Sequence, residues 1–434
     1  MDFQHLTDTC LAEAIGDGGL GDAALTRALM AAAPAHDRLC QLYGSGSLPA
    51  LSAVDGVDDL GPARALATDW RGRLDHVLVL GTGGSSLGGQ TLVALADRGF
   101  GPAGGGPRLV FLDNVDPDTM AAVLGALDLA RTGVLAISKS GGTAETLAQA
   151  LVLLPALERA VGRARMAAHA AVITEPGESP LARMAGAYGL PRLDHHPGIG
   201  GRFSVFSVVG AVPALLAGLD VAALRAGARA TLRATVEAAR VEAAAPAVGA
   251  ALTVGLLQER GVTQSVIMTY DDRLACLGLW FRQLWAESLG KDGTGTTPLR
   301  ALGTADHHSQ LQLYLAGPRD KMFTLVMPIT RGQGPTMDAA LGAAAGAVVL
   351  AGRPMGDLLD AAARATAETL ARNGRPVRRL VLGRVDEATL GAVMMHFMLE
   401  TILAADLLGV NAFDQPAVEE GKVLARRYME EAGE

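Results

Sequence analysis

Cysteine is scarce in this sequence, and the shortage argues against two classes of protein. The 434 residues include only Cys10, Cys40 and Cys276, which lie far apart and not in metal-ligand spacing. A secreted fold held by disulfides, or a cysteine-based metal site, needs paired or clustered cysteines. We therefore expect free thiols in a reducing compartment. No other cluster of ligands is visible, so no metal or other cofactor is implied.

An excess of positive charge is missing as well. The chain has 37 Lys and Arg against 45 Asp and Glu, a net charge of −8, and no basic cluster. Proteins that bind duplex nucleic acid draw their affinity from clustered Lys and Arg, so no nucleic-acid partner is expected. A small anionic substrate is compatible with this charge, because backbone N–H groups and one or two cations can make a pocket locally positive.

Long hydrophobic runs are not expected either. We find no apolar stretch of about 18 residues, the length a membrane span needs. Asp2 and Asp8 lie where a secretory signal carries positive charge. The longest apolar candidates, residues 205–219 and 339–352, are short and rich in Gly, Ala or Ser. We predict that both are buried elements of a cytoplasmic protein with no membrane contact.

The sequence does contain a repeated alternation of short apolar runs and helical stretches. The runs lie at residues 76–80, 108–112, 133–137, 170–173, 264–269, 323–327 and 379–382. Such alternation predicts an α/β fold with parallel sheets covered on both faces, and ligands at the carboxyl ends of the strands. We predict a helical N-terminal segment (1–60), a first α/β domain (61–220), a second α/β domain (221–410) and a C-terminal segment (411–434).

A hydroxyl-rich loop is the first segment suited to chemistry. Ser138-Lys-Ser-Gly-Gly-Thr-Ala-Glu-Thr146 follows an apolar run and precedes a stretch of helical periodicity. Unpaired N–H groups and the helix dipole favour a phosphate at such an N-terminus, and short hydroxyl side chains add donors. The alternative is a capping box with Thr143 as N-cap. Four hydroxyls exceed what a cap needs, so we favour phosphate binding.

The glycine-rich loop Gly81-Thr-Gly-Gly-Ser-Ser-Leu-Gly-Gly89 superficially resembles a dinucleotide fingerprint. The last glycine of that pattern falls on Ser86, and no acidic residue follows at the required distance. A tight turn that brings the backbone and Ser85 close to a polyol fits better. A purely structural turn is an equal alternative.

A helix near residue 280 carries a candidate base. Trp280, Leu284 and Glu287 fall at helical spacing, so the carboxylate projects from an apolar and aromatic face. Partial removal from water suits such an acid to general-base catalysis. The alternative is a surface ion pair between Glu287 and Lys291, one turn apart.

Three further segments each hold one candidate residue. Arg202 lies between glycines, where it could clamp an anion or form a structural ion pair. His307 and His308 are adjacent in a polar loop, where a structural hydrogen-bonding role is more common than catalysis. Pro416 suits the first position of a helix and Lys422 lies one turn beyond Val418, where most lysines are merely solvated.

Taken together and in this order, the segments from about Asp75 to Lys422 resemble the glucose-6-phosphate isomerase family in its compact bacterial form. The helix of Glu287 and the Phe413-Asp-Gln-Pro416 segment distinguish this family from other sugar-isomerase-type proteins. The resemblance implies two sugar-isomerase (SIS) type domains and a homodimer whose active site takes one residue from the partner subunit. It implies interconversion of glucose 6-phosphate and fructose 6-phosphate in glycolysis and gluconeogenesis.

The resemblance also implies a role for each site residue. The phosphate is expected on Ser138, Lys139, Ser140, Thr143 and Thr146, and the sugar against Gly83, Gly84 and Ser85. His308 with Lys422 is expected to open the ring, Glu287 to move the proton between carbons 2 and 1, and Arg202 to stabilise the enediolate. Alignment favours His308 over His307 as the imidazole that faces the sugar.

Two rival functions remain. One is another isomerase on the same scaffold, such as a bifunctional glucose and mannose phosphate isomerase or the isomerising part of an amidotransferase. The other is a phosphosugar sensor, which is disfavoured because such sensors usually carry a basic DNA-binding helix and none is visible here.

Overall fold

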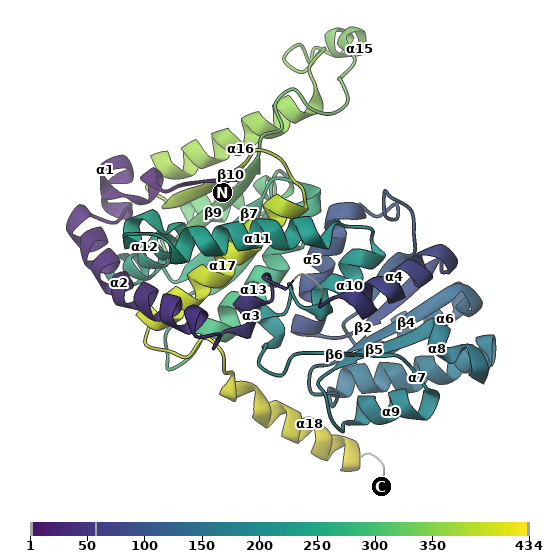
Figure 1. Ribbon diagram of the computed structural model, residues 1–434. Helices are drawn as coiled ribbons and strands as arrows, with labels where there is room; N and C mark the ends of the chain where they lie inside the picture. The colour runs from purple at the N-terminus through teal and green to yellow at the C-terminus, as the bar shows by residue number, and fades with distance from the viewer. Residues whose placement is uncertain (1–2, 57–58, 432–434) are drawn as a thin grey trace.

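The computed structural model describes residues 3–56 and 59–431, which form two α/β units packed side by side (Figure 1). The first unit is built on a five-stranded sheet in which all neighbours are parallel. Its order is β3 (Arg108–Leu112), β2 (His76–Leu80), β4 (Thr132–Ile137), β5 (Ala170–Thr174) and β6 (Arg192–Asp194).

Side chains alternate across the first sheet and contact different helices on its two faces. Val77 and Val79 point into the main hydrophobic core, whereas Leu78 and Leu80 belong to a second core on the opposite face. The helices of the main-core face are α4 (Gly61–Arg73), α5 (Leu87–Ala96) and α10 (Val208–Leu216). Those of the other face are α6 (Pro117–Ala126), α7 (Ala144–Val161), α8 (Met166–His169) and α9 (Pro180–Tyr188). Burial on both faces explains why these strands are apolar along their whole length.

The second sheet is parallel except at one edge. Its order is β1 (Phe3–Leu6), β10 (Val377–Leu382), β9 (Lys321–Pro328), β7 (Gln264–Thr269) and β8 (Thr297–Leu302). Strand β1 is antiparallel to β10, so the N-terminal segment contributes a strand where only helices were expected. One face is covered by α14 (Leu311–Ala316) and α16 (Met355–Arg372). The other adjoins α11 (Val221–Val236), α12 (Ala245–Arg260), α13 (Leu277–Leu289) and α17 (Glu387–Leu407).

The main core is continuous between the two units. Ile267 of β7 and Val79 of β2 belong to one cluster, which also takes in most of the apolar residues of α17. The remaining helices are α1 (Ala12–Ile15), α2 (Asp22–Gly44), α3 (Pro49–Ser52), α15 (Ala339–Ala344) and α18 (Glu419–Glu431). Figure 1 shows α15 at the end of a long extension and α18 projecting from the opposite side.

Two predictions about hydrophobic runs are wrong. Residues 339–352 were expected to be buried, but Leu341 and Val349 are 70% and 77% exposed. Small residues there supply too little apolar surface to hold the segment against the core. The statement that no apolar run is long enough to span a membrane is also wrong. Helix α17 is long and apolar enough to do so. In this protein 94% of its most apolar window is buried, so α17 is a core helix.

Candidate functional site

The two loops predicted to bind substrate lie together at the carboxyl ends of neighbouring strands. The glycine loop comes after β2 and the hydroxyl loop after β4, and these strands pair in parallel register. A Cβ on Gly81 would lie 3.0 Å from the carbonyl oxygen of Ile137, the residue just before Ser138. The start of the glycine loop therefore lies close to the end of β4, at the edge where parallel sheets bind ligands.

The hydroxyl loop does not have the bonding of a capping box. Thr143 is the N-cap residue of α7, but its side chain makes no capping bond. Its Oγ1 instead lies 2.8 Å from Ser138 Oγ. Thr146 is fully buried and its Oγ1 has no hydrogen-bond partner among the described residues. A helix N-terminus without a side-chain cap, beside such a hydroxyl, is suited to an anionic ligand.

Lys139 and Ser140 lie at the open side of the same loop. Lys139 is half-buried and its Nζ lies 3.4 Å from a carboxylate oxygen of Glu175. Ser140 is exposed, and its hydroxyl accepts a hydrogen bond from the N–H of Gly142 at 3.3 Å. The loop therefore presents one cation and several hydroxyls around the first turn of α7.

The glycine loop makes close backbone contacts that only glycine permits. A Cβ on Gly84 would lie 2.1 Å from the carbonyl carbon of Gly201, and one on Gly83 would lie 2.7 Å from Gln283 Nε2. Gly83 also has a positive φ of 52°. These contacts bring 3₁₀ helix η3 (Gly83–Ser85) against η6 (Gly201–Phe203) and α13. Ser85, half-buried, ends the same turn.

Glu287 and Arg202, which are 85 positions apart, meet beside this glycine loop. Arg202 NH1 lies 3.3 Å from Glu287 Oε2, and Gln283 Nε2 donates to Glu287 Oε1 at 3.0 Å. The side chain of Arg202 is 4% exposed and that of Glu287 is 30% exposed. Burial lowers the pKa of Arg202, although Glu287 and Asp414 oppose that shift. An arginine remains charged under these conditions.

The guanidinium of Arg202 has all five of its N–H groups engaged. Its acceptors besides Glu287 are Ser288 Oγ (2.8 Å), Gln415 Oε1 (2.7 Å), the carbonyl of Ala412 (2.6 Å) and the carbonyl of Asp414 (2.9 Å). Arg202 thus joins the end of α13 to residues 411–415. It is at once an ion-pair partner and the anchor of the C-terminal segment.

The alternative interpretation of Glu287, a surface pair with Lys291, is wrong for the described residues. Lys291 Nζ instead lies 2.8 Å from Asp414 Oδ1 and also donates to the carbonyl of Asn411. The carboxylate of Glu287 therefore contacts Arg202 and Gln283 instead.

The two adjacent histidines face different surroundings. His307 Nε2 lies 2.8 Å from Tyr270 Oη and 3.0 Å from Thr366 Oγ1, and burial lowers the pKa of this imidazole. His308 is exposed, and no hydrogen bond of its side chain occurs within residues 3–56 and 59–431. The imidazole of His307 is therefore held by hydrogen bonds within the chain, whereas that of His308 makes none among the described residues. Within one chain, however, no bond between described residues joins His308 to Glu287.

Lys422 lies outside the site in this structure. It is on α18, none of whose described residues is buried, and its side chain is 61% exposed. Its Nζ lies 2.7 Å from Glu419 Oε1 on the same helix. The structure thus brings together the two loops, Arg202 and Glu287, but neither His308 nor Lys422.

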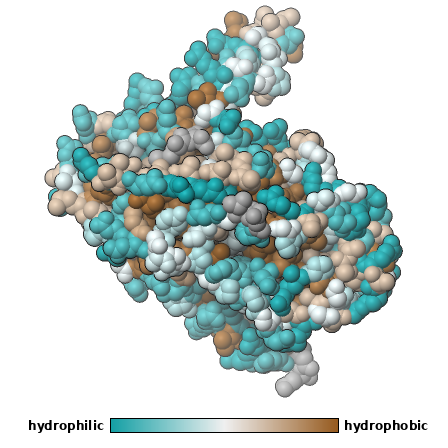
Figure 2. Space-filling model, in the orientation of Figure 1, coloured by the Kyte–Doolittle hydropathy of each residue, from teal (hydrophilic) through white to brown (hydrophobic). Residues whose placement is uncertain are grey.

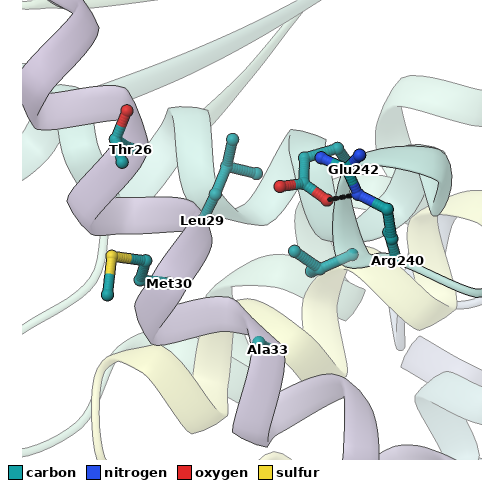
Figure 3. Close-up of a pocket in the computed structure, with 7 residues that line it drawn as sticks. Thr26, Leu29, Met30, Ala33, Arg240 and Glu242 are labelled. Atoms are coloured by element: carbon teal, nitrogen blue, oxygen red, sulfur yellow. Dashed lines mark ion pairs between the residues drawn. The ribbon is translucent and has the colours of Figure 1, made fainter.

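Sequence reasoning missed three residues that contact this pair: Gln283, Ser288 and Gln415. Gln283 precedes Glu287 by one helical turn, so its spacing was a usable signal. Ser288 and Gln415 meet only at Arg202, and no sequence pattern indicates that encounter. A cavity of about 360 Å³ between α2 and the 3₁₀ helix η7 (Val241–Ala243) is lined by none of these groups (Figure 3). The described residues contain no group of His, Cys, Asp or Glu able to hold a metal ion.

The structure defines an α/β protein with two mostly parallel five-stranded sheets flanked by helices. The structure is similar to a glucose-6-phosphate isomerase from Chlamydia trachomatis, with a TM-score of 0.74 and 23% identity over 87% of this chain and 74% of that chain. It is also similar to the C-terminal domain of a glucosamine-fructose-6-phosphate aminotransferase from Francisella tularensis, with a TM-score of 0.51 and 13% identity over 86% of this chain and 96% of that chain. At these identities the likeness shows the fold alone, and it confirms the predicted fold class.

The chain belongs to the phosphoglucose isomerase family, whose model matches residues 60–313. It is 42% identical to a glucose-6-phosphate isomerase of Rubrobacter xylanophilus over 366 residues, 83% of this chain and 84% of the relative. It is 39% identical to one of Thermus thermophilus over 364 residues, 82% of this chain and 84% of the relative. A solved structure of a hypothetical protein from Thermus thermophilus has a TM-score of 0.86 and 35% identity, covering 98% of this chain and 99% of that one. The predicted activity, interconversion of glucose 6-phosphate and fructose 6-phosphate, is confirmed.

Proposed function

We propose that Glu287 is the base of this isomerase and that it works beside Arg202 on a sugar phosphate held by the first domain. The observation that supports this most is the position of the Glu287 carboxylate. It lies 3.3 Å from a buried guanidinium and is hydrogen-bonded to Gln283, which contacts the glycine loop. A base, an oxyanion stabiliser and a phosphate site are the parts that an aldose-ketose isomerisation needs.

The phosphate is held by the loop after β4 in this proposal. Ser138, Ser140, Thr143 and Thr146 donate hydroxyl hydrogen bonds, and Lys139 supplies a cation. The hydroxyl of Thr146 has no other partner in the described parts of the chain, and Thr143 is not used as a cap. Binding therefore costs no existing capping bond, and the phosphate gives the buried Thr146 hydroxyl an acceptor.

The sugar lies against Gly83, Gly84 and Ser85, where the absence of side chains allows close approach. Glu287 removes the proton from carbon 2 of open-chain glucose 6-phosphate, and the carbonyl oxygen at carbon 1 takes up the electrons. Arg202 stabilises the resulting enediolate. The same proton returns to carbon 1, while a proton passes from the oxygen at carbon 2 to that at carbon 1, giving fructose 6-phosphate.

In this proposal His308 and Lys422 open the sugar ring. Within one chain, the described residues do not place either side chain beside Glu287. We propose a homodimer in which the partner subunit supplies His308. The extension of residues 329–354 supports this, because Leu341, Val348 and Val349 are at least 70% exposed on it. Exposed apolar side chains on a projecting segment are typical of subunit contacts. Figure 1 shows that this extension projects away from both sheets.

The cytoplasm is the proposed location. Its support is chemical: Cys10, Cys40 and Cys276 are free thiols, which fits a reducing compartment.

A mixed dimer tests the shared site most sharply. A Glu287→Gln chain and a His308→Ala chain, with different affinity tags, are co-expressed and the doubly tagged species is purified. If the site combines Glu287 of one subunit with His308 of the other, one of the two sites in this dimer is intact. About half of the wild-type kcat is then expected, because the two sites of a twofold dimer are equivalent.

The alternatives give different results. If both residues come from the same chain, neither site in the mixed dimer is intact and the activity stays at the level of the single variants. If the doubly tagged species does not form, the homodimer itself is contradicted. Each parental variant, purified alone, is the matched control.

A further inference from the structure

The end of helix α13 holds the C-terminal segment by two cations. Arg202, fixed through Ser288, donates to the backbone of Ala412 and Asp414. Lys291, just beyond the helix, is bonded to the side chain of Asp414 and the carbonyl of Asn411. The two anchors grip residues 411–415 from neighbouring positions. Glu287 lies on the same last turn of α13.

Lys291 is more buried than most lysines near a surface. Its side chain is only 11% exposed, and its ammonium also lies 3.3 Å from the carbonyl oxygen of Ser288. Three acceptors therefore fix it in one position. Hydrogen bonding to Lys291 lowers the pKa of Asp414, which favours the carboxylate form of this partner. No described contact of Lys291 involves the groups assigned to substrate binding.

The anchor matters because of the residues that come directly after it in the chain. Gln415 is the last anchored side chain, and Lys422 comes seven positions later on α18. Seven residues span at most about 25 Å when extended and far less when helical. The place where residues 411–415 are anchored therefore limits where Lys422 can reach. In this structure α18 is exposed, and none of its described residues is buried.

We propose that Lys291, through Asp414, is a positioning residue for the isomerase reaction: it fixes residues 411–415 so that Gln415 stays on Arg202 and Lys422 can reach the sugar. This rests on the proposed function, in which Arg202 and Lys422 act on the substrate. Lys291 itself does not contact the substrate. Lys291 instead determines the positions of Gln415 and Lys422, which matter once the substrate is bound.

The experiment replaces Lys291 by Met and Asp414 by Asn, singly and together, and measures kcat, KM and the thermal midpoint of each protein. Misplacement by about 1 Å lowers turnover up to about 100-fold, so kcat of Lys291→Met is expected to fall about 10- to 100-fold. KM is expected to stay within about twofold, because the phosphate loop is untouched. The double variant is expected to be no worse than the poorer single variant, because both changes break one contact.

Controls separate positioning from stability. Lys291→Arg retains the charge and is expected to recover most of kcat. Arg27→Met removes a surface ion pair with Glu259, whose side chains are 62% and 43% exposed, and is expected to leave kcat unchanged. Asp414 is 52% exposed, so Asp414→Asn is expected to fold even if Lys291→Met does not.

The proposal is overturned if kcat of both single variants stays within twofold of wild type. It is also overturned if kcat falls only in proportion to the folded fraction, or if the losses are additive in the double variant. Glu287→Gln, assayed in parallel, separates the two claims. Full activity of Glu287→Gln contradicts the proposed function, whereas an inactive Glu287→Gln beside fully active Lys291 variants contradicts only the positioning role.

Discussion

The guanidinium of Arg202 places a condition on catalysis at the scale of a single residue. All of its N–H groups already have protein acceptors, so one bond must break before an enediolate oxygen can be bound. NH1 is shared by Glu287 and Gln415, and the bond to Glu287 is the longest of the five at 3.3 Å. When Glu287 accepts the proton its charge is lost, and the attraction of NH1 shifts to the enediolate. Proton transfer and oxyanion stabilisation are thereby linked.

A second residue-scale consequence concerns Thr146. Its hydroxyl is buried without a partner among the described residues, so Thr146→Val is expected to change the free energy of unfolding by less than about 1 kcal/mol, or to raise it. A hydrogen bond to a charged phosphate contributes about 1.5–3 kcal/mol, so KM for fructose 6-phosphate is expected to rise about 10- to 100-fold. Urea unfolding and steady-state kinetics check the two halves separately. A less stable protein with unchanged KM would contradict a role in phosphate binding.

At the scale of elements, the sequence predicted the interior strands and the edge strand β3, and missed the other three edge strands. The four runs from 76 to 173 and three from 264 to 382 correspond to β2, β3, β4, β5, β7, β9 and β10. Strand β6 has only three residues, β8 contains Pro298 and Arg300, and β1 pairs with a strand more than 370 positions away. Edge strands carry polar residues on a half-exposed surface, so hydrophobic periodicity is weak there.

The candidate site was predictable in its parts but not in its assembly. The loop of Ser138 and the helix of Glu287 are local patterns, which strand-loop-helix order reveals. The contact of Arg202 with Glu287 and with residues 411–415 depends on how the two units pack. The internal hydrogen bonds of His307, which leave His308 available, likewise join β7, η9 (Ala305–His307) and α16. No sequence spacing encodes such contacts.

The packing of η3 on η6 gives a prediction at this scale. Gly84→Ala forces a Cβ to 2.1 Å from the backbone of Gly201, so the two turns must separate. Overpacking of this kind costs about 1–3 kcal/mol of stability, and we expect kcat to fall at least about tenfold because Arg202 is bonded directly to Gly201. Gly125→Ala, on α6, is the matched control, because no atom lies within 4 Å of a Cβ placed there. Equal behaviour of the two variants in unfolding and kinetic assays would refute the importance of this packing.

At the scale of the whole molecule, polar groups lie deep inside a largely apolar core. Arg378 and Glu400 form an ion pair at 2.7 Å, with exposures of 2% and 0%, and His396 lies 3.2 Å from Glu400. His5 of β1 packs its ring against that of His396. Figure 2 shows hydrophilic and hydrophobic residues mixed over the visible surface. The side chains of Arg378, Glu400 and His396 lie beneath the surface, each at most 2% exposed.

Burial in this cluster predicts how stability depends on pH. It lowers the pKa of His396 and of His5, so both are neutral in the folded protein at a pH where the unfolded chain binds protons. Because the unfolded state binds more protons, the free energy of unfolding falls as pH drops below about 6.5, by at most about 1.4 kcal/mol per pH unit for each histidine. Urea unfolding between pH 7 and pH 5 measures this slope. His396→Gln is expected to flatten it, and a wild-type protein equally stable at both ends would contradict the role of burial.

The role of Glu287 as the base is the central claim for the whole enzyme, and one comparison tests it directly. The kcat of Glu287→Gln is measured with fructose 6-phosphate in a coupled assay, beside Glu368→Gln, which removes an exposed carboxylate from α16. General-base catalysis contributes about 10²- to 10⁴-fold, so Glu287→Gln is expected to lose at least about 100-fold in kcat while Glu368→Gln stays near wild type. A Glu287→Gln enzyme that turns over at the wild-type rate would contradict the proposed site.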